Sequence, residues 1–191
     1  MKQIFTSSNL KIFISALLII SLVGYFYFEA SLILRFAVVA LGLISLWQIS
    51  STPEIAVLTV LYLFLYDLYN IHYGIGIPTS VMMVAVFAIS YCLFFVHGVL
   101  IKFKEGVEQK LFDIFNVVTS LVLLELFLTM GFWPVDPRTK SFVIVVTYYL
   151  ISRIIYLFAK NMLSLRRALG YMVVSFIVLS LIIFLNLKLN P

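Results

Sequence analysis

The chain has 191 residues, of which 64% are hydrophobic and only 11% are charged, and its net charge is +5. Soluble domains carry about 25% charged residues, so this composition excludes an ordinary soluble protein and indicates a protein embedded in a bilayer. The apolar runs are long enough to cross a hydrocarbon core of about 30 Å as helices, and they lack the alternation of a membrane β-barrel. The single cysteine, Cys92, excludes an intrachain disulfide.

The first half of the chain predicts four spans, at residues 12–28, 30–49, 55–73 and 77–101. The first span follows a short basic leader and lacks the small residues of a signal-peptide cleavage site, so we expect an uncleaved helix. Only Glu29 and its neighbours separate the first two spans, which predicts a tight antiparallel hairpin. Residues 51–54, with Pro53 and Glu54, are typical of a helix start, and the glycines and proline of residues 74–78 predict a break.

The second half predicts three more spans, at residues 111–132, 141–160 and 168–187. Residues 102–110 are hydrophilic and form a connector, and the two prolines within residues 133–140 stop a helix from running through. The predicted fold class is therefore all-α, a polytopic transmembrane helix bundle in a single integral membrane domain, residues 1–191. We expect about seven spans, or six if the first span or the turn at Glu29 is misplaced.

Lysine and arginine in the short loops predict the orientation. Eight lie on the side shared by the N-terminus and the second, fourth and sixth loops: Lys2, Lys11, Lys102, Lys104, Lys110, Lys160, Arg166 and Arg167. Three lie on the other side: Arg138, Lys140 and Lys188. The N-terminus is therefore expected in the cytoplasm. The protein itself is expected in an inner or plasma membrane. The net charge of +5 is mainly this orientation signal, so no nucleic-acid partner is needed to explain it; the expected partner is the lipid bilayer.

The richest polar segment is residues 62–78. Four tyrosines, Tyr62, Tyr66, Tyr69 and Tyr73, share one helical stripe, and Asp67 and Asn70 lie on a second stripe beside it. Tyrosine favours the membrane interface, which explains Tyr69 and Tyr73. The deeper Tyr62 and Tyr66 are expected to hydrogen-bond Asp67, Arg35 or a ligand.

Three charged residues lie at a similar depth inside predicted spans. With 1.5 Å of rise per residue, Arg35, Asp67 and Glu125 lie about 8, 9 and 10 Å from the outer ends of their helices. Because unpaired charge is costly in hydrocarbon, we expect them to face the bundle interior, with Arg35 paired to Asp67. The candidates for binding or ion pairing are Arg35, Asp67, Glu125, Tyr66 and Asn70. The pattern leaves open whether this cluster is structural or functional.

A second candidate cluster lies toward the cytoplasmic side, formed by Arg153, Asn116, Asp113 and His97. Arg153 is expected to snorkel toward the interface or to lie over a tyrosine ring. On the fifth span the face with Glu125 is opposite the face with Asn116, so the two clusters are not expected to form one polar path. His72 and His97 lie near opposite surfaces, and the sequence predicts no metal site, cofactor or catalytic residue.

One resemblance concerns residues 53–76. Pro53-Glu54-Ile55, Leu65-Tyr66-Asp67-Leu68 and Gly74-Ile75-Gly76 resemble the pattern of the small polytopic rod-shape-determining membrane proteins. The glycine-rich approach of that family is replaced here by Tyr62-Leu63-Phe64-Leu65, so its function is not carried over. The resemblance implies only a role in assembly.

Absent motifs restrict the function classes. The chain lacks a phosphate-binding glycine loop, a zinc-protease motif and a nucleophile elbow, and it has no lysine in the middle of the last span to hold retinal. We therefore interpret it as a non-enzymatic membrane protein, a subunit or assembly partner of a larger membrane or envelope complex that has other membrane proteins as partners. The alternative is a small transporter or channel that uses Arg35, Asp67 and Glu125.

Overall fold

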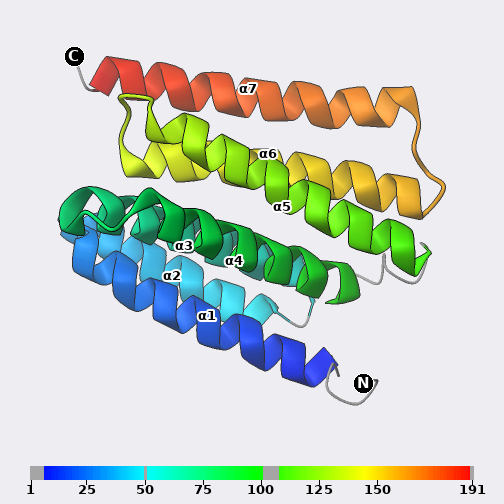
Figure 1. The fold of residues 1–191 in the computed structure, drawn as a ribbon, viewed down its shortest axis with the longest axis horizontal. Coiled ribbons are helices and arrows are strands. Elements are labelled where there is room, and N and C mark those ends of the chain that lie inside the picture. Colours follow the sequence, from blue (N-terminus) through cyan, green and yellow to red (C-terminus); the bar gives the residue numbers. More distant parts are fainter. Residues whose placement is uncertain (1–6, 50, 101–107, 190–191) are drawn as a thin grey trace.

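The computed structural model describes residues 7–49, 51–100 and 108–189, and within these ranges the chain forms helices and no strand (Figure 1). In chain order the helices are α1 (Ser7–Phe28), α2 (Leu32–Gln48), α3 (Pro53–Ile75), α4 (Thr79–Leu100), α5 (Gln109–Gly131), α6 (Pro137–Ala159) and α7 (Leu165–Leu189). Six of these seven are long and apolar enough to span a membrane. The predicted all-α bundle is confirmed, and the chain is a multi-pass membrane protein.

The short helix is α2, with 17 residues. At 1.5 Å per residue it is about 25 Å long, slightly less than a hydrocarbon core of about 30 Å. It begins two residues later than predicted because Ser31 is its N-cap, with the side chain accepting a hydrogen bond from the Leu34 N–H. Whether the chain has six or seven spans therefore depends on whether α2 crosses the membrane.

Helix α3 has the ends that the sequence predicts. Pro53 occupies the first turn, where its missing N–H costs nothing, and Glu54 follows it. At the other end Gly76 adopts a left-handed conformation with φ of 76°, and its N–H bonds the His72 carbonyl. The predicted break is confirmed.

Helix α6 begins at Pro137 rather than at residue 141, so the predicted start is wrong. Asp136 caps the helix by accepting a 2.6 Å hydrogen bond from the Thr139 N–H, and Pro137 fits the first turn. Pro137 therefore starts a helix here, whereas the sequence predicts that it only prevents one. As a result Arg138 and Lys140 lie on a helix and not in a loop.

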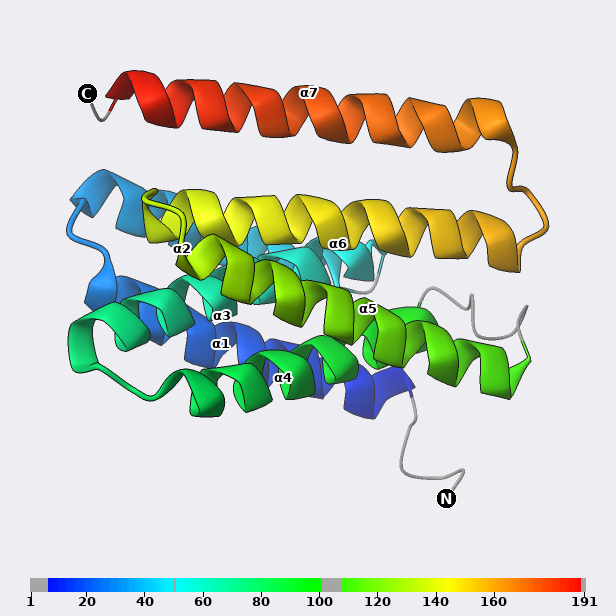
Figure 2. The ribbon, with the colours of Figure 1, turned by 45° about the horizontal axis from the view of Figure 1, so that its top comes forward.

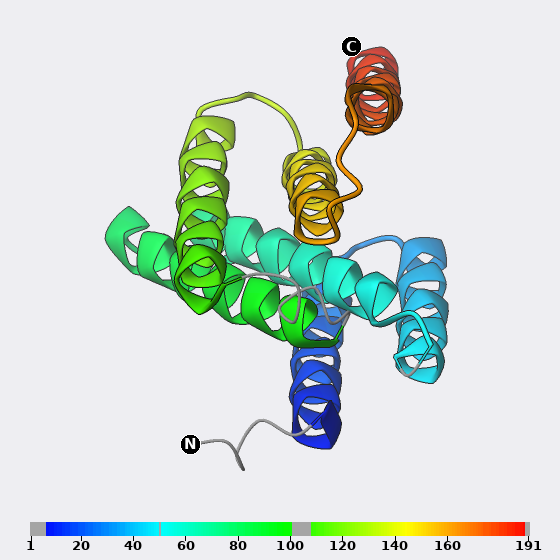
Figure 3. The same ribbon diagram turned by 90° about the vertical axis from the view of Figure 1, so that its right-hand side faces the viewer.

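The helices run back and forth along one axis. We call the hairpin end the end where α1–α2, α3–α4 and α5–α6 are joined, at the left of Figure 1, and the N-terminal end the end where α1 begins. Helix α3 is central and packs against α1, α2, α4 and α6. Helix α7 packs mainly on α6 and lies at the edge of the bundle (Figures 2 and 3).

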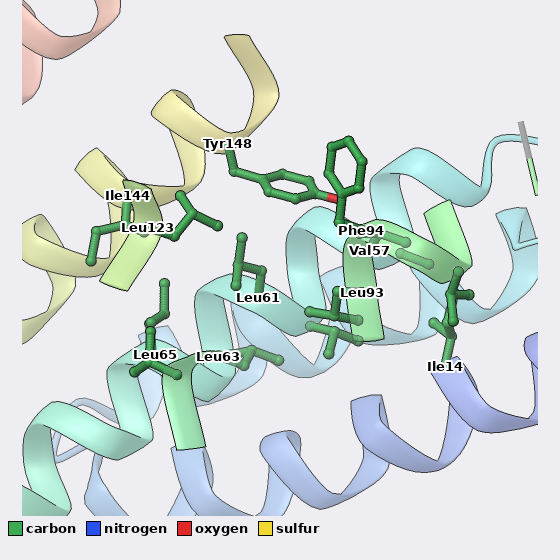
Figure 4. Close-up of a cluster of buried hydrophobic side chains, with 14 of the residues drawn as sticks. Ile14, Val57, Leu61, Leu63, Leu65, Leu93, Phe94, Leu123, Ile144 and Tyr148 are labelled. Atoms are coloured by element: carbon green, nitrogen blue, oxygen red, sulfur yellow. The ribbon is translucent and has the colours of Figure 1, made fainter. Parts of the chain in front are cut away.

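The core surrounds α3. Leu61, Leu63 and Leu65 are all fully buried, although side chains two residues apart on a helix point to different sides. Around them, Figure 4 shows residues from four neighbouring helices: Ile14, Phe94, Leu123, Ile144 and Tyr148. Helix α3 is therefore enclosed by protein, and it brings the polar residues of the other helices together.

Candidate functional site

An ion pair with a buried carboxylate joins the α1–α2 turn to α6 near the hairpin end. Glu29 lies in the turn between α1 and α2, and its side chain is fully buried. Arg138 approaches from the first turn of α6, with Nη2 donating to Oε1 at 2.7 Å and Nε donating to Oε2 at 3.0 Å. This is the fork geometry in which an arginine binds a carboxylate most strongly.

Other donors complete the surroundings of Glu29. The Ser31 N–H donates to Oε1 at 2.9 Å, and the Tyr66 hydroxyl donates to Oε2 at 3.3 Å. Burial alone would raise the pKa of the Glu29 carboxyl, but the Ser31 N–H and the Arg138 guanidinium favour the ionised form and hold the pKa below its usual range. Glu29 therefore ties the α1–α2 turn to α3 and α6.

The predicted pair of Arg35 with Asp67 is wrong. Arg35 Nε donates to the backbone carbonyl of Glu29, and its guanidinium lies 4.9 Å from the centre of the Phe26 ring. These contacts hold Arg35 at the α1–α2 turn, because it lies only one turn into α2 from that connection. The arginine that meets a buried carboxylate is Arg138 instead.

Asp67 is buried on α3 and faces α1. A Cβ added to Gly24 would collide with the Asp67 carboxylate, so the carboxylate occupies the space that a side chain on α1 would take. Within the described ranges the Asp67 Oδ1 has no hydrogen-bond partner. Asp67 is thus a buried carboxyl that forms no ion pair with any residue the structure describes, which is an uncommon arrangement inside a membrane span.

Glu125 points away from the bundle. It is exposed on α5, whereas Asn116 and Ser120 of the same helix are buried, so the two faces are opposite, as the helical period predicts. The Glu125 carbonyl accepts from the Thr129 hydroxyl. Among the described residues no hydrogen bond or ion pair reaches the Glu125 carboxylate. The expectation that it faces the bundle interior is therefore wrong.

The tyrosine stripe of α3 binds the backbone of α5. Tyr69 donates to the Phe127 carbonyl and Tyr73 donates to the Gly131 carbonyl, each at 2.9 Å. Lys140 Nζ donates to the Tyr73 hydroxyl at 2.7 Å and lies 4.7 Å from the centre of that ring. These bonds satisfy carbonyls at the end of α5, so this part of the stripe is structural.

Asn70 has a local partner. Its side-chain amide donates to the Tyr66 carbonyl at 2.7 Å, within α3 itself. This bond repeats the i to i−4 direction of the helix and does not reach another helix. Of the residues predicted around Asp67, Tyr66 therefore joins the buried ion pair, and Asn70 does not.

The second predicted cluster forms in part, near the N-terminal end. Arg153 Nη2 donates to Glu54 Oε2 at 2.6 Å, and the guanidinium lies 5.4 Å from the centre of the Tyr149 ring. His97 is fully buried, with Nδ1 at 3.0 Å from the Tyr148 hydroxyl and Nε2 at 3.9 Å from Glu54 Oε1. The structure thus brings Arg153 and His97 together around Glu54.

The other two members of that cluster stay apart from the ion pair. Asp113 accepts a hydrogen bond from Gln109 at 2.7 Å on the first turns of α5, and within the described ranges it forms no ion pair with Arg153. Asn116 is fully buried, and neither atom of its side-chain amide has a hydrogen-bond partner among the described residues. Asn116 belongs to a polar patch inside the α5 interface, together with Ser120.

Sequence reasoning missed both carboxylates that carry the ion pairs. The sequence pattern predicts Glu29 as part of a turn and Glu54 as a helix-start residue. A signal was present, because the predicted topology places Glu29 on the same side as Arg138, and Glu54 on the same side as Arg153. Charges at matching depth on different spans are the natural pairs in a bundle.

The fold and these contacts define a multi-pass membrane protein with an interhelical ion pair near each end. Among the described residues no group of three or more histidine, cysteine or acidic side chains is placed to hold a metal ion. No protein family model, curated protein or solved structure matches the chain. The likeness to rod-shape-determining proteins therefore supports no assignment of function, and the function is argued from the geometry alone.

Proposed function

We propose that the chain is a non-enzymatic subunit or assembly partner of a larger membrane complex, and that its α5 surface around Glu125 binds the partner. The observation that supports this is a carboxylate exposed on a spanning helix. Glu125 is six residues before the end of α5, which corresponds to about 9 Å of helix. We place the complex in an inner or plasma membrane, because long apolar helices are typical there.

A charged side chain facing lipid is unfavourable. At the centre of a bilayer it costs about 2.5–3.5 kcal/mol on insertion scales, and such groups normally face a partner or a polar cavity. A donor on a neighbouring membrane helix would remove that cost. The partner expected here is a spanning helix that carries a lysine, arginine, histidine or hydroxyl group at the depth of Glu125.

The surroundings of Glu125 suit helix packing. Ile114, Val118 and Leu121 are exposed on α5 and precede Glu125 with spacings of four, three and four residues. Residues with this spacing form one stripe, which is the surface that one helix offers to another. The stripe combines an apolar contact area with a single acidic group that fixes the depth of the partner.

Site-specific photocrosslinking tests the proposal. A photoreactive residue in place of Leu121 is expected to give one defined protein adduct in native membranes, and Glu125→Leu in the same chain is expected to remove it. The matched control is the same photoreactive residue at Val23, which is exposed on α1. An adduct of twice the mass of the chain would identify the partner as a second copy.

Stability separates loss of the partner from loss of the fold. Because the Glu125 carboxylate contacts no hydrogen-bond or ion-pair partner among the described residues, Glu125→Leu should leave the thermal unfolding midpoint of the isolated chain in detergent unchanged or higher. Lipid adducts alone from Leu121, or a protein adduct that persists in Glu125→Leu, would contradict a partner surface at Glu125.

A second function, transport, is favoured by one observation, the buried carboxyl of Asp67. A carboxyl without a cationic partner inside a span is the type of group that carries protons in pumps and transporters. Because Arg35 lies elsewhere, Asp67→Asn leaves no arginine unpaired and should keep the fold. Loss of proton-coupled flux in liposomes by Asp67→Asn, at unchanged stability, would support transport, and a wild-type chain without any flux would contradict it.

A further inference from the structure

A long groove opens on a side of the bundle to which α5 contributes no residue. Its volume is about 630 Å³, and residues of α2, α3, α6 and α7 line it. Figure 3 shows how these four helices are arranged. The α2 side contributes Leu34 and Leu41, and the α7 side contributes Val174 and Val178. No residue of α5 lines it, so the groove is separate from the partner surface at Glu125.

The groove is apolar along its length and has a cation at one end. Arg138 lines it near the hairpin end, and Tyr149 lines it 11 residues further along α6, a distance of about 16 Å. That length matches half of a hydrocarbon core of about 30 Å. The groove therefore reaches from the level of Arg138 toward the middle of the bilayer.

Arg138 keeps donors for a second acceptor. Nε and Nη2 bind Glu29, and the guanidinium also hydrogen-bonds the Tyr66 side chain. The Arg138 side chain is nevertheless 44% exposed, so N–H donors remain open to the groove. A guanidinium has five N–H donors in a plane, which suits phosphate as well as carboxylate. The Glu29 carboxylate holds Arg138 in place, so a phosphate would meet an oriented group.

The size of the groove decides between a lipid and a helix. A helix of 20 residues is about 30 Å long, roughly twice the length of about 16 Å that the groove follows along α6. A volume between 300 and 1,000 Å³ is in contrast typical of sites that enclose a small molecule. A flexible chain fits this space, and a protein helix would lie mostly outside it.

We propose that this groove binds a membrane phospholipid, with an acyl chain between α2 and α7 and the phosphate on Arg138. Helix α7 packs mainly on α6, so it can move aside to admit the lipid from the bilayer. The site would fix α7 to the rest of the bundle through the bound lipid. This goes beyond the proposed role as a subunit and does not depend on it.

Native mass spectrometry of the full-length chain in mild detergent tests the site. The probes are a phosphatidylglycerol and a diacylglycerol with the same acyl chains, added separately. One bound phosphatidylglycerol is expected, with the diacylglycerol about tenfold weaker or more, since it lacks the charge-assisted bond to Arg138. Equal binding of the two would overturn the role of Arg138.

A matched pair of variants on α7 tests the groove itself. Val174 lines the groove and Val173 does not, although both are exposed to a similar degree, 58% and 54%. Val174→Trp is expected to weaken phosphatidylglycerol binding about tenfold by filling the groove, and Val173→Trp is expected to bind like the wild type. Equal binding by the two variants at equal unfolding midpoints would overturn the site.

The remaining outcomes are also decisive. Arg138→Lys keeps a positive charge beside Glu29 but loses the planar fork, so phosphatidylglycerol binding should fall while diacylglycerol binding stays the same. A dimer that Val174→Trp disrupts, without any bound lipid, would show that a second copy covers the groove and would overturn the proposal.

Discussion

Gly24 and Asp67 meet where α1 packs against α3, and this contact requires a residue without a side chain. A Cβ at residue 24 would collide with the Asp67 carboxylate. Gly170 also lies inside a helix, but no atom is within 4 Å of the place where its Cβ would be. The two glycines therefore form a matched pair for the same substitution.

Gly24→Ala is expected to destabilise the chain by roughly 1–3 kcal/mol, because overpacking forces the carboxylate or the helices to move. Gly170→Ala should be neutral or slightly stabilising, since alanine has the higher helix propensity. Thermal unfolding in detergent measures both. In an Asp67→Ala background the cost of Gly24→Ala should largely disappear, and an undiminished cost there would assign it to another contact.

Glu29 predicts a pH dependence of stability. Its pKa is lower in the folded chain than in the unfolded chain, so its contribution is complete above the unfolded pKa of about 4.5 and is lost as the pH falls through the folded value. The unfolding midpoint in detergent should therefore decrease between about pH 5 and pH 3.

Glu29→Gln is the control for this dependence. The amide keeps the size of the side chain but cannot titrate, so the variant should be less stable at neutral pH, where Arg138 loses its charged partner, and less sensitive to acid. Identical acid sensitivity of the variant and the wild type would show that other carboxyls cause the effect.

At the scale of the elements, α3 differs from a helix at the lipid boundary because it is enclosed on several sides. Leu61 of α3 is fully buried, and Leu43 of α2 is 61% exposed. In a bilayer the lipid is as apolar as leucine, so what burial adds is packing rather than removal from water. A cavity in α3 therefore costs stability, whereas a shorter side chain at the lipid surface does not.

Leu61→Ala should lower the free energy of unfolding by roughly 2 kcal/mol, near the lower limit for such changes in soluble cores, because only the cavity term remains. Leu43→Ala should change it by less than about 0.5 kcal/mol. Reversible unfolding in mixed micelles gives both values. A cost at Leu43 equal to that at Leu61 would contradict the central position of α3.

The positions of the helices were predictable from hydropathy and from helix-ending residues. Long apolar runs and residues such as Gly76 determine the local backbone conformation without any contact to other helices. The helix start at Pro137 was not predictable, since a proline is compatible with both the end and the beginning of a helix. Because α6 begins one turn earlier than predicted, Arg138 lies on the helix, where it pairs with Glu29. Pairing depends on how helices rotate and slide against each other, so Arg35 was assigned to the wrong carboxylate.

For the whole molecule, the ion pairs and the topology depend on each other. Glu29 with Arg138 lies toward the hairpin end, and Glu54 with Arg153 lies toward the N-terminal end. Helix α7 ends at the hairpin end, opposite the start of α1 (Figure 1). If the short helix α2 crosses the membrane with the other six, the two ends of the chain lie on opposite sides.

The excess of lysine and arginine at the N-terminal end predicts that this end is cytoplasmic. In a Cys92→Ser background, Phe132→Cys at the hairpin end should react with a membrane-impermeant maleimide in intact cells. Ser51→Cys, at the other end, should react only after the membrane is opened. Both positions are exposed, so access of the reagent is limited by the bilayer and not by the fold. The reverse labelling pattern would contradict the predicted orientation. Labelling of both cysteines in intact cells would mean that the connections at residues 51 and 132 lie on one side of the membrane, which seven crossing helices do not allow.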